Sequence, residues 1–118
     1  MIKNVLILED NIGISKLLKI YLEKHSYKID IVRYGRTGMI KALNTHYDLI
    51  ILDIFLPDMN GFHILKKIRE LKSTPVIMLS TQDDKEVMKF SFESGANEYI
   101  LKPFSCKHIV NIVNKLIS

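Results

Sequence analysis

The sequence places three acidic residues, a serine and a lysine at the ends of four of its five short apolar runs. In chain order these residues are Glu9, Asp10, Asp53, Ser80 and Lys102. Carboxylates that lie close together repel one another and resist ionisation unless a cation compensates their charge. A lysine ammonium can balance one carboxylate, and Mg²⁺, a hard cation that prefers oxygen ligands, can balance the others. The pattern therefore predicts a magnesium site, provided that the fold brings these ends together.

Asp53 is the residue with the clearest chemical use. With a cation in place, its carboxylate can attack phosphorus as a nucleophile and form an acyl phosphate. Lys102, the Ser80 hydroxyl and the metal would stabilise charge on the equatorial oxygens. Taken alone, Asp53 is more simply explained as the end of a strand or the cap of a turn. The single cysteine and the four histidines show no metal-ligand spacing and are expected at or near the surface: Cys106, His25, His46, His63 and His108.

Alternating strand and helix patterns must position these side chains. The apolar runs predict buried strands over 4–8, 27–32, 49–52, 75–79 and 99–101. Amphipathic helical patterns follow each run, including 37–46, 62–71, 83–94 and 106–117. This order predicts one α/β domain over 1–118, a doubly wound five-stranded parallel sheet within a three-layer α/β/α sandwich. The flavodoxin-like strand order 2-1-3-4-5 is the natural arrangement of five such units, and it places all the strand ends on one edge.

Local patterns give expectations for the helix faces and turns. The first helix is expected to bury Ile14, Leu17, Leu18 and Tyr21, and the third to bury Phe62, Leu65, Ile68 and Leu71. The turn 56–61 ends in Asn60-Gly61, a pair that permits positive φ. Gly95 is expected to stop the fourth helix.

Composition narrows the class of protein. The 118 residues are 47% hydrophobic and 25% charged, which is typical of one globular domain. The net charge of +4 is spread over the predicted helices without a basic tail, so we expect no direct nucleic-acid binding. No run is long enough to cross a membrane and no signal peptide is evident. One cysteine allows no intrachain disulfide, which favours a cytoplasmic location.

Four segments together are highly specific. They are residues 8–11 (LEDN), 48–61 (DLIILDIFLPDMNG), 75–80 (PVIMLS) and 95–104 (GANEYILKPF). With them the chain resembles, from end to end, the receiver domain of bacterial two-component response regulators. The resemblance implies a signalling switch that takes a phosphoryl group from a sensor histidine kinase and catalyses only its own phosphorylation and dephosphorylation. The chain is then expected to be either a stand-alone regulator or the receiver of a longer protein that controls transcription through a DNA-binding domain outside this chain.

The resemblance assigns roles to the strand-end residues. Asp53 matches the phosphoacceptor, and Glu9 and Asp10 match the acidic pair that holds Mg²⁺. The backbone carbonyl of Phe55 matches a further metal ligand. Lys102 matches the phosphate-binding lysine, which precedes a cis peptide bond in this family.

The resemblance also implies a switch and a docking surface. Ser80 matches the switch hydroxyl and Tyr99 the switch aromatic. The cis peptide bond is then expected before Pro103. The family's kinase-docking surface corresponds to Asn11, Gly13, Ile14, Leu17 or Leu18, Pro103 and Phe104.

Three residues near the expected site affect access to it. Thr81 stands where the family usually has alanine or glycine, and its branched side chain is expected to narrow the entrance for phosphodonors and water. Phe55 and Gln82 occupy positions that tune autodephosphorylation in the family. Phe55 either shields the acyl phosphate or simply packs at the surface.

The expected output surface also departs from the family. Receivers of winged-helix transcription factors usually dimerise through helix 4, strand 5 and helix 5 by charged pairs. Here Met88, Asn97, His108 and Ile112 replace charged partners, so a homodimer lacks most of that network. Met88, Phe90, Phe92 and Ile112 form either an apolar patch or part of the core.

Two other functions fit the same fold. One is a phosphate-independent interaction module, which the complete acidic set and Lys102 disfavour. The other is a flavin-binding electron carrier, which lacks a phosphate-cradling loop after the first strand.

Overall fold

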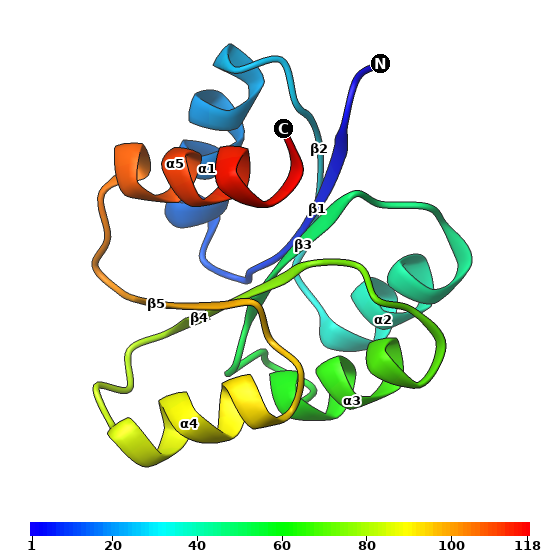
Figure 1. Ribbon diagram of the computed structural model, residues 1–118, viewed down its shortest axis with the longest axis vertical. Helices are drawn as coiled ribbons and strands as arrows, with labels where there is room; N and C mark the ends of the chain where they lie inside the picture. Colours follow the sequence, from blue (N-terminus) through cyan, green and yellow to red (C-terminus); the bar gives the residue numbers. More distant parts are fainter.

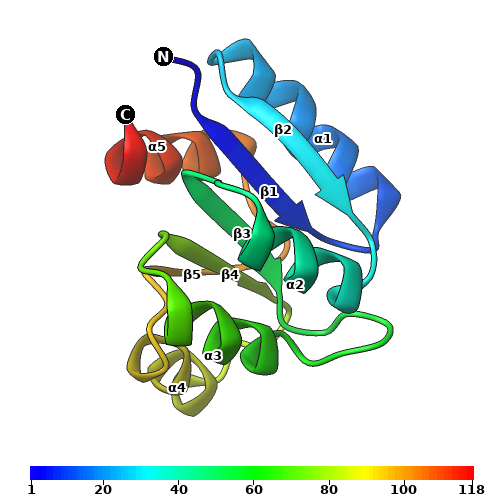
Figure 2. The ribbon, with the colours of Figure 1, turned by 90° about the vertical axis from the view of Figure 1, so that its right-hand side faces the viewer.

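Five parallel strands form the centre of the molecule in the order β2-β1-β3-β4-β5, and the computed structural model describes all residues 1–118. The strands are β1 (Asn4–Leu8), β2 (Lys28–Val32), β3 (Leu49–Asp53), β4 (Val76–Ser80) and β5 (Glu98–Leu101). Two helices cover one face, α1 (Ile12–Lys24) and α5 (Cys106–Ile117). Three cover the other, α2 (Gly35–Asn44), α3 (Gly61–Leu71) and α4 (Lys85–Glu93) (Figures 1 and 2). The predicted doubly wound sandwich and its strand order are confirmed.

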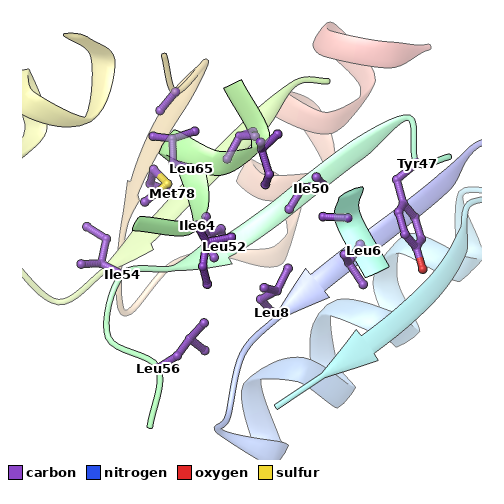
Figure 3. Close-up of a cluster of buried hydrophobic side chains, with 14 of the residues drawn as sticks. Leu6, Leu8, Tyr47, Ile50, Leu52, Ile54, Leu56, Ile64, Leu65 and Met78 are labelled. Carbon is purple, nitrogen blue, oxygen red and sulfur yellow. The ribbon is translucent and has the colours of Figure 1, made fainter. Parts of the chain in front are cut away.

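The sheet divides the hydrophobic core into two layers. Strands β3 and β4 are buried along their whole length, as expected for central parallel strands with helices on both faces. Alternate side chains of each strand enter opposite layers. The layer under α2 and α3 contains Leu6, Leu8, Ile50, Leu52 and Met78 (Figure 3). The layer under α1 and α5 contains Val5, Ile7, Leu49, Ile51, Ile77 and Leu79.

The predicted buried faces of two helices are only partly correct. Leu18 in α1 and Leu65 and Ile68 in α3 are buried as predicted. In α1 the buried residues are Ser15, Leu18 and Leu22, whereas Leu17 and Tyr21 are 45% and 38% exposed. In α3 Ile64 is fully buried, and Leu71 is 71% exposed. Each helix carries more apolar residues than one stripe can hold. Packing against the sheet therefore determines which of two overlapping apolar stripes is buried. Helical periodicity alone does not identify that stripe.

Gly61 is required for a different reason from the one predicted. Asn60 has φ −77° and caps α3, accepting the Phe62 N–H on its side-chain oxygen at 2.8 Å. A side chain on Gly61 would bring its Cβ within 2.6 Å of the Asp53 carbonyl oxygen. Close packing against the end of β3, rather than positive φ, excludes other residues. Gly95 does follow α4 with φ +105°, which confirms that prediction.

Helix α2 receives the side-chain bonds at both of its ends from segments that flank α3. Tyr34, at its N-cap, makes no side-chain capping bond, and Asp58 accepts the Gly35 N–H instead at 2.7 Å. At the other end, the Lys72 ammonium donates to the Ala42 carbonyl at 2.9 Å and to the Thr45 carbonyl at 3.2 Å. Each charge matches the helix dipole at its end. Because the N-terminal cap is remote in sequence, α2 starts two residues before the predicted position.

Replacing Lys72 is expected to destabilise the protein through the end of α2. Lys72→Met removes two hydrogen bonds to helix-end carbonyls and should lower the free energy of unfolding by about 0.5–1.5 kcal/mol. Urea denaturation would measure this change. Lys67→Met is the matched control, because Lys67 pairs only with Glu70 at 3.5 Å with both side chains 47% exposed. Equal stability of the two variants would contradict the capping role.

Candidate functional site

The five polar residues at the strand ends lie together at one edge of the sheet. Leu8 pairs with Leu52 in the register of β1 and β3, so Glu9 and Asp53 follow at the same level. The Lys102 ammonium, after β5, lies 2.8 Å from Asp53 Oδ2 and 2.5 Å from Glu9 Oε1. The Lys102 backbone N–H also donates to the Ser80 carbonyl at 2.8 Å. The structure therefore brings together the residues that the sequence identified.

Two of the three acids in the cluster, Glu9 and Asp53, are buried, and Asp10 is half-buried. Carboxylate oxygens of Glu9, Asp10 and Asp53 all lie within 4.8 Å of one another, and Glu9 and Asp53 are 0% and 4% exposed. Burial raises the pKa of Glu9, and the Asp53 charge adds to this effect, although Lys102 and the Asn11 N–H oppose it. Burial also works against the Lys102 ammonium, but its bonds to Asp53 and Glu9 outweigh burial and raise its pKa.

The donor set fits a divalent cation. Glu9 Oε1 is buried, and its partner is the Lys102 ammonium, with which it forms an ion pair. When all three carboxylates are ionised, the single ammonium leaves two negative charges, which an ion such as Mg²⁺ would neutralise. All the available side-chain ligands are oxygens, as Mg²⁺ prefers. Glu9, Asp10 and Asp53 are the residues that would hold it.

Asp53 is held by the segment that follows it. Its Oδ1 accepts the Phe55 N–H at 3.0 Å, and Oδ2 accepts the Lys102 ammonium. The Phe55 side chain is 54% exposed, beyond the end of β3. One carboxylate oxygen therefore has a backbone donor and the other a cationic donor, which fixes the orientation of the group.

Ser80 and Tyr99 are joined through the backbone of Gln82. Ser80 is fully buried, and its Oγ accepts the Gln82 N–H at 2.9 Å. The Tyr99 hydroxyl donates to the Gln82 carbonyl at 2.6 Å. Thr81, which stands between Ser80 and Gln82 in the sequence, is exposed. This link uses main-chain atoms, so residue types alone did not reveal it.

The residues proposed for kinase docking are only partly available at the surface. Asn11 is exposed and caps α1 by accepting the Ile14 N–H at 3.0 Å. Leu17 is exposed, but Leu18 is 1% exposed and packs into the core. Of the two alternatives, Leu17 is therefore the accessible residue, because Leu18 faces the sheet rather than solvent. Gly13 and Pro103 are exposed, Ile14 and Phe104 are half-buried, and the peptide bond before Pro103 is cis as predicted.

The four apolar residues near α4 and α5 do not form a single surface. Phe90 is turned towards α3, where its ring meets Phe62 edge-on with centroids 4.8 Å apart. Met88 instead lines a cavity of about 400 Å³ with residues of β5 and the segment after it. Ile112 is half-buried against the core, and Phe92 is 45% exposed. Neither alternative raised for these four residues therefore describes all of them.

Asn97 and His108 differ in how the fold uses them. The Asn97 side-chain oxygen accepts the Val76 N–H at 2.9 Å and an Arg69 N–H at 3.0 Å. It thereby ties the start of β4 to α3. His108 lies exposed beside the Met88 cavity.

The chain belongs to the response regulator receiver domain family, whose sequence profile it matches over residues 5–114. It is 38% identical over 113 residues to the transcriptional regulatory protein ResD of Bacillus subtilis, covering 96% of this chain and 47% of that protein. It is 39% identical over 117 residues to the transcriptional regulatory protein SrrA of Staphylococcus aureus, covering 99% and 48%. The chain thus spans about half the length of these curated relatives.

Solved structures give the same assignment. A CheY-like receiver domain protein from Methanospirillum hungatei superposes with a TM-score of 0.92 at 30% identity, covering 98% of this chain and 93% of that one. A receiver domain described as BeF3-activated DrrB superposes with a TM-score of 0.91 at 26% identity, covering 98% and 97%. None of the helices has the length and apolar character needed to cross a bilayer.

Removing the Glu9 charge is expected to stabilise the metal-free protein at neutral pH. Because its pKa is raised, folded Glu9 keeps a proton at pH values where the unfolded chain has lost it. Wild-type stability should therefore rise as pH falls from the folded-state pKa towards the ordinary value of 4.5. Glu9→Gln should lose that rise and be the more stable protein at pH 7, as measured by urea denaturation across pH. Asp83→Asn, at an exposed acid outside the cluster, is the control. Parallel pH profiles for wild type and Glu9→Gln would refute this account.

Proposed function

We propose that this chain is a phosphorylatable signalling switch in which Asp53 accepts a phosphoryl group from a sensor histidine kinase. The observation that carries the proposal is the position of the Asp53 carboxylate. It is nearly buried at the sheet edge, bonded to Lys102 at 2.8 Å and within 4.8 Å of two other carboxylates. Membership of the receiver domain family supports the same chemistry.

In the proposed reaction a carboxylate oxygen of Asp53 attacks phosphorus. The bond from phosphorus to the donor's imidazole nitrogen breaks, and the imidazole leaves with the electron pair. Lys102 stabilises negative charge on the phosphoryl oxygens, and the Ser80 hydroxyl can donate a hydrogen bond to one of them. Bound Mg²⁺, with Glu9, Asp10, Asp53 and the Phe55 carbonyl as its proposed ligands, would neutralise charge on the acids and the phosphoryl group.

The link through Gln82 suggests how the signal leaves the site. Ser80 Oγ holds the Gln82 N–H, and Tyr99 holds the carbonyl of the same residue. A Ser80 hydroxyl that turns to the phosphoryl group would therefore disturb the segment before α4 and the position of Tyr99. We propose that phosphorylation shifts a two-state population of the surface formed by α4, β5 and α5.

The relatives suggest what this surface controls. ResD and SrrA are described as transcriptional regulatory proteins, and this chain matches about half of each. We therefore propose that the switch controls transcription through a DNA-binding domain outside residues 1–118. A homodimer through α4, β5 and α5 is part of this proposal, although Asn97 already bonds within the chain.

Phosphoryl labelling tests the function directly. Wild-type protein should gain the mass of one phosphoryl group from acetyl phosphate only when Mg²⁺ is present. Beryllofluoride should produce a change in the spectrum or oligomeric state under the same condition. Asp53→Asn, which has nearly the same shape, should show neither response, and Asp83→Asn should behave like wild type. Labelling that persists in Asp53→Asn would refute the assignment. A wild type without any response would favour a phosphate-independent interaction module.

Thr81 is expected to slow access to the acyl phosphate. Thr81→Ala should accelerate both labelling by acetyl phosphate and hydrolysis of the adduct by several-fold, because it opens the entrance for the donor and for water. Intact-mass time courses would measure both rates. Thr81→Val keeps the branched shape and should resemble wild type. If Thr81→Ala also shows unchanged rates, the side chain does not restrict access.

A further inference from the structure

We propose that Asp58 is a positioning residue for the metal site, although it is not one of the clustered carboxylates. It would act by fixing the loop that runs from β3 to α3 against the start of α2. This inference rests on the proposed function, because it concerns how the Mg²⁺ ligands are held. The loop matters because it begins at Asp53 and carries the Phe55 carbonyl, which is one of the proposed metal ligands.

The base of this loop is closed by backbone contacts. Phe55 and Asn60 form an isolated antiparallel bridge, and the Gly61 N–H donates to the Ile54 carbonyl at 2.6 Å. Leu56 is 8% exposed and packs in the core layer under α2 and α3. These contacts fix both ends of the segment but leave its tip, Asp58 and Met59, to be held by something else.

The tip of the loop rests on α2. Asp58 Oδ1 accepts the Gly35 N–H at 2.7 Å, and Oδ2 accepts the Arg36 N–H at 3.1 Å. A side chain on Gly35 would place its Cβ 2.8 Å from the Met59 Cβ, so no space remains between the two segments. Both carboxylate oxygens are used, and the negative charge faces the positive end of the helix dipole.

Helix α2 in turn packs tightly on β1. A Cβ added to Gly38 would overlap the Leu8 side chain, so the helix backbone lies directly on that residue. Leu8 immediately precedes Glu9 and Asp10. Asp58 therefore connects the two halves of the acidic cluster: the end of β1, through α2, and the end of β3, through the loop. Loss of this connection should let the two halves move relative to each other.

Asp58→Ala and Lys72→Met form a matched pair that separates positioning from general stability. Each removes two hydrogen bonds from α2, one variant at its start and the other at its end. Both should lower the urea denaturation midpoint by a similar amount. Only Asp58→Ala should weaken Mg²⁺ binding, by roughly threefold to tenfold, at or below the lower limit seen for outer-shell partners of metal ligands. Isothermal titration with MgCl₂ alone would measure the affinity.

A third variant and the wild type complete the test. Asp58→Asn keeps one acceptor oxygen and should recover part of the Mg²⁺ affinity. Unchanged affinity in Asp58→Ala, or equal weakening in Lys72→Met, would overturn the positioning role while leaving the proposed function intact. A wild type that neither binds Mg²⁺ nor accepts a phosphoryl group on Asp53 would overturn both proposals. A wild type that is labelled on Asp53 but binds no Mg²⁺ in the titration would overturn the positioning role alone.

Discussion

The gathering of three carboxylates at one edge of the sheet is the constraint on which the rest of this structure depends. Glu9 and Asp53 are almost completely removed from water, and only Lys102 compensates their charge among the side chains. A buried carboxylate is costly unless it is paired. The hydrophobic layers on both faces of the sheet must therefore offset the unfavourable free energy of burying these carboxylates. The apolar residues along the rest of each strand provide the burial that stabilises the fold around such a site.

The parallel sheet makes this concentration of charge geometrically simple. Every strand points the same way, so residues from distant parts of the sequence meet without any long excursion of the chain. The same arrangement gives each strand end a following loop. Those loops hold the surrounding residues: one carries Phe55, another carries Gln82, and a third carries Pro103. The proposed metal site and the proposed switch residues therefore lie next to each other.

The sequence predicted which residues gather at the sheet edge because each strand end is a local signal. An apolar run that stops at Asp53 or Lys102 can be recognised without knowledge of distant contacts. The helix faces were harder, since Leu17 and Leu71 satisfy helical spacing as well as the residues that are actually buried. Gly61 was identified as a turn residue, but its reason, close packing on Asp53, depends on tertiary structure. The role of Asp58 has one indirect sign. Tyr34 is a poor N-cap residue, so the start of α2 needs a cap from another segment of the chain.

Because neighbouring segments bond to both ends of α2, these bonds also affect how the protein unfolds locally. A helix that carries its own caps can fray and re-form independently of its neighbours. Here the bonds at the two ends of α2 come from Asp58 and Lys72, on either side of α3. Local unfolding that includes α3 and its flanking residues would release both sets of bonds, so α2 and α3 are expected to open together.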